Sequence, residues 1–250
     1  MRYLKITLLI LVCNSCIAIS PKEEGSGKPI SHDQWTELLQ KYIHGNKVDY
    51  KGFIQDSVKL NEYLRLLETN HPNQENFTKI EQLAYWINAY NAFTIRIVIR
   101  NHPLSSIRDI AGAIPFINSV WDIKFIRIAE ETYDLNNIEH GVLRSQFQEP
   151  RIHFAINCAS VSCPTLRNEA YVADKLEAQL QEQTLLFLKD ESKNQIEFNK
   201  LELSKIFRWF GGDFEKGENS KEDFIKEQLG IELSDEVKLE YRDYDWSLNE

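Results

Sequence analysis

One long apolar helix constrains this chain more than any other feature. The stretch Lys79–Arg100, KIEQLAYWINAYNAFTIRIVIR, is predicted to form a single helix that ends before His102-Pro103, because the residue before a proline disfavours the helical conformation. With about 100° between successive residues, only three side chains gather into a polar sector: Gln82, Arg96 and Arg100. A helix that is apolar nearly all round has to be buried. We therefore expect this helix at the centre of the fold.

Two amides interrupt the apolar surface of this helix. Asn88 and Asn91 lie three residues apart and so share one face. A buried amide that makes no hydrogen bond costs roughly 1–3 kcal/mol, so both side chains need partners. They either tie the helix to neighbouring loops or line a site in which they orient a catalytic group or a substrate.

The stretch Arg151–Pro164, RIHFAINCASVSCP, is the second unusual feature. Neither side of the run Ile152–Ile156 is clearly polar, which predicts a buried strand in the middle of a sheet. Cys158 follows, where the run gives way to small polar residues, and such loop positions often carry chemistry. Three roles stay open for this thiol: a nucleophile, one half of a disulfide with Cys163, or packing.

The N-terminus has the layout of a secretory signal peptide over residues 1–20. Arg2 and Lys5 precede the apolar run Ile6–Val12, which is too short to span a bilayer. Cys16 offers a lipoprotein cleavage site as an alternative to plain secretion, and an apolar N-terminus without an export role is the third reading. Residues 21–30 then form a polar linker, and residues 31–250 form one globular domain. We expect a secreted or periplasmic protein, or one anchored to the envelope through a lipid on Cys16.

Composition narrows the class of partner. The 250 residues include 42% hydrophobic and 27% charged residues, as in a globular domain, and the net charge is −9. Nucleic-acid binding needs a basic surface, so nucleic acid is not expected as a partner. Export also makes a Cys158–Cys163 disulfide plausible, because disulfides persist in oxidising compartments.

The remaining segments alternate between helices and short strands. Helices are predicted over about 31–42, 57–68, 136–148, 170–188 and 204–210, the last ended by Gly211-Gly212, and over a final segment between Ser220 and Gly230. Strands are predicted at Trp121–Ile128, Thr132–Leu135, Gln195–Phe198 and Val237–Tyr241. The aromatic tail is expected to dock on the body. This order predicts an α+β fold: one small, mostly antiparallel sheet with Ile152–Ile156 at its centre and the long helix packed against it.

The chemistry of a reactive thiol asks for a base close to Cys158. A thiol with an ordinary pKa of about 8.5 needs a cationic neighbour or a helix N-terminus to become a thiolate. His140 is the best candidate, because its helix feeds directly into the segment that carries Cys158, and Asn88, Asn91 or an acid would orient the imidazole. Glu139 precedes His140 but points about 100° away from it around the helix, so it should not contact the imidazole ring. We expect it to form an ion pair with Arg144 or Arg151 instead.

Other site chemistries find less support. His153 is a second candidate base. Strand alternation, however, would point its side chain away from the Cys158 side, so a hydrogen-bonded role in the core is favoured for this residue. The sequence contains no C-x-x-C, H-x-x-H or H-E-x-x-H pattern, and Cys158 with Cys163 would need two further ligands to hold zinc. The sequence predicts no metal site and no cofactor.

Taken in order, several motifs resemble the DUF547 family. They are Tyr85–Ala92 (YWINAYNA), His102-Pro103, Leu135–Arg144 (LNNIEHGVLR), Pro150–Pro164 and, in secreted bacterial members, Tyr244–Asn249 (YDWSLN). The resemblance covers about residues 35–250 and implies a common domain without a settled activity. The family's motif positions fall here on Asn88, Asn91, Glu139, His140 and Cys158.

A thiol, a histidine and buried amides on one domain are also broadly similar to the papain and transglutaminase group, by analogy alone. The order departs from that group, because here the histidine precedes the cysteine. Two functions follow as hypotheses. The first is a secreted cysteine-dependent hydrolase or acyl transferase acting on peptide or amide bonds. The second is a non-catalytic domain that binds a peptide or an envelope protein, in which Cys158 is structural.

Overall fold

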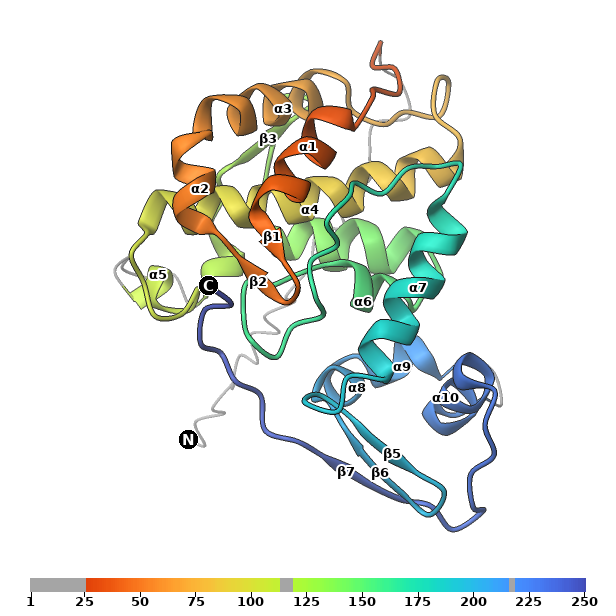
Figure 1. Ribbon diagram of the computed structural model, residues 1–250. Helices are drawn as coiled ribbons and strands as arrows, with labels where there is room; N and C mark the ends of the chain where they lie inside the picture. The colour runs from red at the N-terminus through yellow and green to blue at the C-terminus, as the bar shows by residue number, and fades with distance from the viewer. Residues whose placement is uncertain (1–25, 113–118, 216–218) are drawn as a thin grey trace, which may run out of the picture.

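The computed structural model describes residues 26–112, 119–215 and 219–250. The expected signal peptide, Cys16 and the first half of the linker, residues 21–25, lie outside these residues. Helices dominate, and the strands form small sheets, so the α+β class is confirmed (Figure 1). None of the helices in the described part of the chain is long and apolar enough to cross a membrane.

Residues 26–188 form a mainly helical part and the residues that follow form a smaller mixed part (Figure 1). The first contains α1 (Asp33–Tyr42), β1 (Ile43–His44), β2 (Lys47–Val48), α2 (Tyr50–Gln55), α3 (Ser57–Thr69), α4 (Lys79–Asn101), α5 (Asp109–Gly112), η1 (Val120–Asp122), β3 (Ile126–Ile128), β4 (Glu131–Tyr133), η2 (Asn137–Arg144), α6 (Ile152–Ala155) and α7 (Leu176–Leu188). The second contains β5 (Gln195–Glu197), β6 (Lys200–Leu203), α8 (Ile206–Trp209), α9 (Gly211–Phe214), α10 (Lys221–Leu229) and β7 (Lys238–Tyr241).

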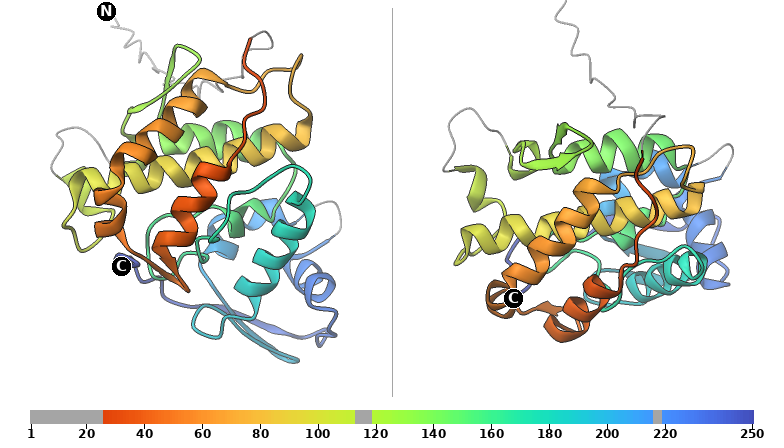
Figure 2. Two further views of the ribbon diagram at one scale, coloured as in Figure 1. Left: turned by 45° about the horizontal axis from the view of Figure 1, so that its top comes forward. Right: turned by 90° about the horizontal axis from the view of Figure 1, so that it is seen from above.

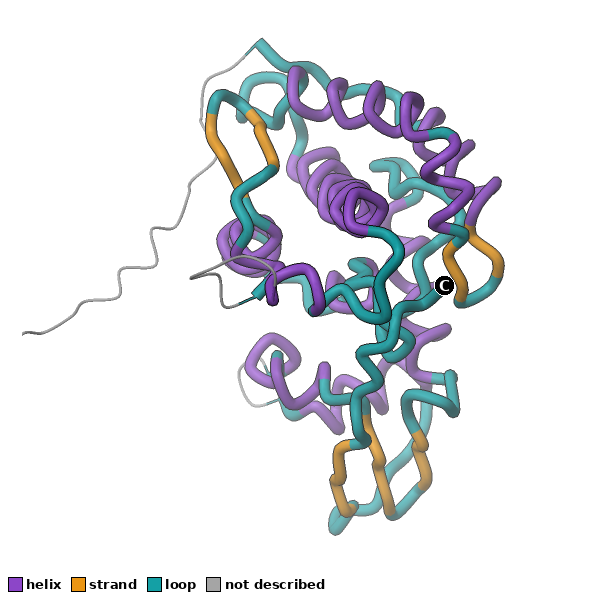
Figure 3. Tube along the Cα trace, turned by 90° about the vertical axis from the view of Figure 1, so that its left-hand side faces the viewer, coloured by secondary structure: helices purple, strands orange, loops and turns teal. Residues whose placement is uncertain are grey.

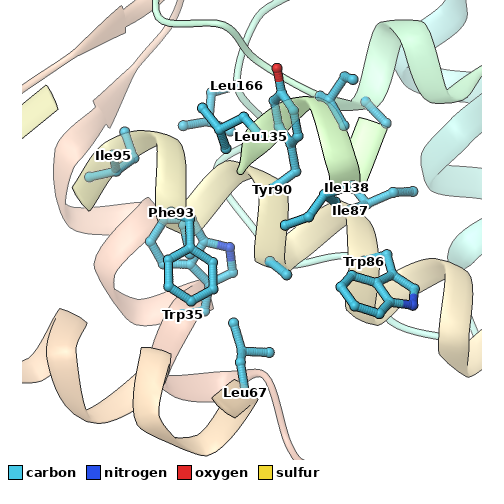
Figure 4. Packing of buried hydrophobic residues seen from close by; sticks show 14 of the residues in the cluster. Trp35, Leu67, Trp86, Ile87, Tyr90, Phe93, Ile95, Leu135, Ile138 and Leu166 are labelled. Atoms are coloured by element: carbon cyan, nitrogen blue, oxygen red, sulfur yellow. The ribbon is translucent and has the colours of Figure 1, made fainter. Parts of the chain in front are cut away.

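Helix α4 lies at the centre of the larger part, as its composition predicts. A capping box starts the helix. The Thr78 hydroxyl accepts a hydrogen bond from the backbone N–H of Glu81, and the Glu81 carboxylate accepts one from the backbone N–H of Thr78. The helix packs against α2, α3 and η2, and it runs through the middle of the view from above in Figure 2. Its side chains are buried from Leu83 to Ile95. Figure 4 shows the surrounding packing of aromatic and aliphatic side chains.

The prediction of one sheet with Ile152–Ile156 as its central strand is wrong. The strands lie in three separate places (Figure 3). Two are antiparallel hairpins, β1–β2 and β3–β4, and the third is a sheet in which β6 pairs antiparallel with β5 and parallel with β7. Residues Ile152–Ala155 form the helical turn α6 instead. A run of five apolar residues fits a buried helical turn as well as a buried strand.

Several other boundaries differ from the predictions. The helix expected at 136–148 forms, but over Asn137–Arg144 it is a π-helix, a rare form that often occurs at functional sites. The strand expected at Trp121–Ile128 is confined to β3, the helix expected at 170–188 begins only at Leu176, and strand β6 was not predicted. Helix α8 ends just before Gly211-Gly212, as predicted, but these two glycines then begin α9.

Two hydrophobic cores fill the molecule. The larger surrounds α4, and the smaller joins α7, β6, α8, α9 and α10 around Phe154. The C-terminal tail docks on the larger part, as expected: the backbone N–H of Leu248 donates to the carbonyl of Ser105 at 2.8 Å, and that of Val161 donates to Ser247 at 2.9 Å. The tail therefore carries the chain from β7 back across the boundary between the cores (Figure 1).

Candidate functional site

A cavity of about 180 Å³ lies where the two cores meet. Its walls come from α4, η2 and α6 on one side and from α8 and the C-terminal tail on the other. Cavities at such junctions are common binding sites. Glu139 and His140, which are neighbours on η2, and Cys158, which follows α6, all line it. Six aromatic side chains also line it: Tyr90, Trp121, Trp209, Phe210, Tyr244 and Trp246.

Cys158 and Cys163 form a disulfide at one wall of this cavity. The hydroxyl of Tyr244 lies 3.3 Å from each sulfur, and the Ser160 hydroxyl lies 3.4 Å from that of Cys158. The backbone N–H of Cys158 also donates to the Cys163 sulfur at 2.8 Å. Of the three roles left open for Cys158, the structure shows the second, one half of a disulfide with Cys163. Hydrogen-bond donors surround both sulfurs.

Asn88 and Asn91 hold the backbone of neighbouring loops. The Asn91 amide donates to the carbonyl of Ala155 and accepts from the N–H of Asn157, both at 2.9 Å. The Asn88 amide donates to the carbonyl of Tyr171 at 2.7 Å and accepts from the N–H of the same residue at 3.0 Å. Neither amide lines the cavity. Of the two roles considered for them, the structure shows the tie to neighbouring loops, and Asn91 fixes the segment that leads into Cys158.

Glu139 is the buried acid of the cavity. Its side chain is 7% exposed, and its Oε2 accepts a hydrogen bond from the Tyr90 hydroxyl at 3.2 Å. Tyr90 points that hydroxyl away from the packed rings of Trp35 and Phe93 (Figure 4). Burial raises the pKa of Glu139 to about 7, because an apolar environment disfavours the charged form.

The ion pair expected between Glu139 and either Arg144 or Arg151 is absent from the described part of the structure, so that prediction is wrong. Arg151 pairs with Glu149 and Glu177. Arg144 pairs with Asp213, through Nε to Oδ2 at 2.5 Å and Nη2 to Oδ1 at 2.9 Å. Oε1 of Glu139 has no hydrogen-bond partner among the described residues, which leaves it available to a ligand in the cavity.

His140 is held in one tautomer by its neighbour on η2. Its Nδ1 lies 3.0 Å from Nη1 of Arg144. A guanidinium only donates hydrogen bonds, so Nδ1 accepts and the ring proton sits on Nε2. Partial burial, followed by the charge of Arg144, lowers the pKa of His140. The ring is therefore neutral at pH 7 and presents an N–H donor.

His153 also lines the cavity, contrary to the prediction that it points away from the Cys158 side. That prediction rested on strand alternation, and the residue instead belongs to the helical turn α6. Its ring stacks on Phe210 with centroids 4.1 Å apart. Its Nε2 lies 2.7 Å from Oδ2 of Asp213. Burial lowers the pKa of His153, which is then neutral, so Nε2–H donates to the carboxylate and Nδ1 keeps a lone pair.

Asp213 ties the two histidines together, and sequence reasoning missed it. Burial alone would raise the pKa of this carboxyl, but hydrogen bonds from His153 and Arg144 hold it far below its ordinary value. The residue is therefore a carboxylate that orients His153 directly and His140 through Arg144. Sequence spacing gives no sign of this contact, because Asp213 follows His153 by 60 residues.

Residues 74–188 match the family model "Protein of unknown function, DUF547". The match spans α4, η2, α6, the disulfide loop and α7, so it includes Glu139, His140 and Cys158. It supports the resemblance seen in the Tyr85–Ala92 motif and the motifs that follow it. The DUF547 match ends before α8 and the tail. The second wall of the cavity therefore lies outside the match, and so does Asp213, which contacts His153 from α9. Comparison with curated proteins and with solved structures finds no match.

Proposed function

We propose that the cavity is the active site of a cysteine-dependent hydrolase or acyl transferase that acts on peptide or amide bonds. Cys158 is the nucleophile once its disulfide is reduced. The observation that carries this proposal is the convergence of Cys158, two neutral histidines and Glu139 on one aromatic-walled cavity. A thiol with a nearby base that is itself oriented by a third group is the arrangement that nucleophilic catalysis requires.

Reduction by a dithiol is the activating step. One thiolate of the reductant attacks the sulfur of Cys163 and displaces Cys158 as a thiolate. The second thiol of the reductant then displaces Cys163 and closes the reductant's own disulfide. The hydroxyls of Tyr244 and Ser160 already lie 3.3 and 3.4 Å from the Cys158 sulfur. Hydrogen bonds from these groups would stabilise the thiolate and lower the pKa of the thiol.

The two histidines divide the remaining work. Asp213 accepts the Nε2 proton of His153, which leaves Nδ1 of that ring to take the proton of the Cys158 thiol. The thiolate attacks the carbonyl carbon, and a carbon–sulfur bond forms. The carbon–nitrogen bond then breaks as His153 returns its proton to the leaving amine. His140, with its proton on Nε2, supplies a donor for the developing oxyanion. Water or a second amine finally cleaves the thioester.

The alternative is a non-catalytic binding domain in which Cys158 is structural, and the closed disulfide favours it. Two matched variants separate these functions. Cys163→Ser leaves Cys158 as a free thiol, and Cys158→Ser leaves Cys163. A catalytic Cys158 alkylates with iodoacetamide at pH 6 at least about tenfold faster than free cysteine does, because its thiolate fraction is larger. Mass spectrometry of the modified peptide follows the rate. Equal alkylation rates for Cys158 and Cys163 in the two variants and for free cysteine would refute the catalytic role.

We also propose where the protein acts and on what kind of substrate or partner. The chain is a secreted bacterial protein whose residues 1–20 are removed by a signal peptidase, and its substrate or partner is a peptide or protein of the cell envelope. A lipid on Cys16 is the alternative to free secretion. The mass of the mature N-terminus tests both: a chain that keeps Met1 contradicts export, and a lipid mass that Cys16→Ala removes identifies a lipoprotein.

A further inference from the structure

Aromatic rings crowd the mouth of the cavity. Trp209 and Tyr244 have centroids 4.8 Å apart, Tyr244 and Trp246 4.7 Å, and Trp121 and Trp246 5.5 Å. These rings come from α8, the tail and η1, so the fold gathers them from distant parts of the chain. Trp209 remains 45% exposed. The cluster already holds one cation at its outer side, because the guanidinium of Arg108 lies 5.3 Å from a Trp246 ring centroid.

The charges around the cavity favour a positive ligand. None of the described residues that line it is a lysine or an arginine, and Glu139 is the one acidic side chain among them. The nearby Asp213 is already neutralised by Arg144. An ionised Glu139 therefore contributes an unbalanced negative charge, with Oε1 unpartnered. An anionic ligand would be repelled by this carboxylate.

We infer that the cavity binds a primary ammonium group at the end of a narrow aliphatic chain, as in a lysine side chain. The ring faces stabilise the cation, which is the usual use of such aromatic clusters, and Glu139 supplies the counter-charge. A narrow chain of four methylenes suits a cavity of about 180 Å³ better than a bulky head group does. This inference rests on the proposed function in one respect: the bound group is the acceptor that cleaves the thioester. The ammonium first gives a proton to Glu139, and the resulting amine attacks the thioester carbonyl. A carbon–nitrogen bond forms, and the carbon–sulfur bond breaks with release of the Cys158 thiolate.

The acid also makes binding depend on pH. Four titratable or charged groups interact with the charge of Glu139: Tyr90, Arg144, Asp213 and Tyr244. His140 and His153 line the same cavity. Burial raises the pKa of both tyrosines and lowers that of both histidines, so Glu139 is the group that ionises around pH 7. The affinity for the ammonium group should fall by about tenfold for each pH unit below this value, because the carboxylate fraction falls in the same proportion.

The test uses the full-length chain with the Cys158–Cys163 disulfide closed, so that Cys158 is not a thiolate, and three ligands of similar size. n-Butylammonium reproduces the lysine side chain beyond Cα, 1-butanol is neutral, and butyrate is anionic. Tryptophan fluorescence and calorimetry measure affinity at pH 8. We expect n-butylammonium to bind at least about tenfold more tightly than 1-butanol, with butyrate weakest. Equal affinity for the first two ligands, or a preference for butyrate, would overturn the inference.

Matched variants locate the binding. Glu139→Gln should lower the affinity at pH 8 by at least about tenfold and remove the pH dependence, whereas Glu131→Gln removes an exposed charge on β4 and should change neither. Trp209→Leu should weaken binding, and Phe198→Leu, an aromatic residue that is 64% exposed outside the cavity, should not. If Glu139→Gln binds like the unaltered chain, the inference fails. If that variant does not fold, the pH profile of the unaltered chain decides instead.

The inference and the proposed function fail separately. A chain that binds n-butylammonium but whose Cys158 alkylates no faster than free cysteine keeps the ammonium site and loses the catalytic role. A reactive Cys158 in a chain that does not distinguish n-butylammonium from 1-butanol keeps the catalytic role and loses the ammonium site.

Discussion

The buried acid of the cavity should impose a measurable cost on the fold at neutral pH. Glu139→Gln keeps the size of the side chain and still accepts the hydrogen bond from Tyr90, but it removes the charge. The pKa of Glu139 is raised from 4.5 to about 7 in the folded state, with burial as the main cause. We therefore expect the variant to be more stable than the unaltered chain at pH 8.

The sign and size of this effect follow from proton linkage. Between pH 4.5 and about 7 the folded state holds the Glu139 proton more tightly than the unfolded state does. The free energy of unfolding therefore falls as the pH rises through this window, and it stays lower above it. A shift of one pKa unit corresponds to about 1.4 kcal/mol. The raised pKa of Glu139 should therefore make the unaltered chain less stable than the variant by about 3 kcal/mol at pH 8. Below pH 4 this contribution should be absent.

Urea unfolding of both chains at pH 4, 5, 6, 7 and 8 measures the effect. The difference between the two chains is the quantity to follow, because the histidines act in the opposite direction. Burial lowers the pKa of His32, His140 and His153, so their contribution to stability rises with pH up to their ordinary value. Those contributions are common to both chains and cancel in the difference.

A difference that stays constant across this pH range would refute the reasoning, because it would mean that Glu139 has an ordinary pKa in the folded state. Glu131→Gln is the control: this exposed carboxylate on β4 loses the same charge, and its effect should stay within about 0.5 kcal/mol throughout. A larger change in the control would show that net charge, and not burial, drives the result.

Three further changes test the frame around the cavity. Asn91→Ala should lower the free energy of unfolding by about 2–4 kcal/mol in urea, because it leaves two buried backbone groups unpaired, whereas Asn61→Ala on the exposed face of α3 should cost less than about 0.5 kcal/mol. Asp213→Asn should cost about 2 kcal/mol at pH 7. The pKa of the Asp213 carboxyl is lowered in the folded state, so this difference should begin to shrink as the pH falls below the ordinary value of 3.8 and should keep shrinking at still lower pH. Reduction of Cys158–Cys163, which closes a loop with a sequence separation of 5, should lower stability by about 2 kcal/mol in thermal unfolding; an unchanged melting temperature would contradict this.

The sequence predicts the elements whose signals are local. The apolar periodicity of Lys79–Asn101 marks the central helix, and Ser220 and Gly230 cap α10 as expected, the latter with a left-handed φ of 64°. The segment Ile152–Ile156 fails because both of its faces are buried. Such a segment carries no periodicity to separate a strand from a helical turn. The wrong prediction for this one segment also led to the wrong prediction of a single sheet with Ile152–Ile156 at its centre.

The site was predictable only in part, for the same reason. Glu139, His140 and Cys158 lie within 20 residues of one another in motifs that stand out in the sequence, and all three line the cavity. His153 was set aside because of the incorrect strand. Asp213 was missed because only the packing of the second core brings it to His153, and no local pattern reports such a contact.

The loop that carries Cys158 is held in place without its disulfide. Asn91 fixes Asn157 from the central helix, and the Asn157 side chain in turn bonds the backbone of Ala159 at 2.8 Å and of Pro164 at 2.7 Å. From the other side, Asn249 of the tail donates its backbone N–H to the carbonyl of Ala159. Because these buried bonds clamp the loop from both sides, reduction need not release it. The freed thiol would stay on the wall of the cavity, which is the position that the proposed catalytic role needs.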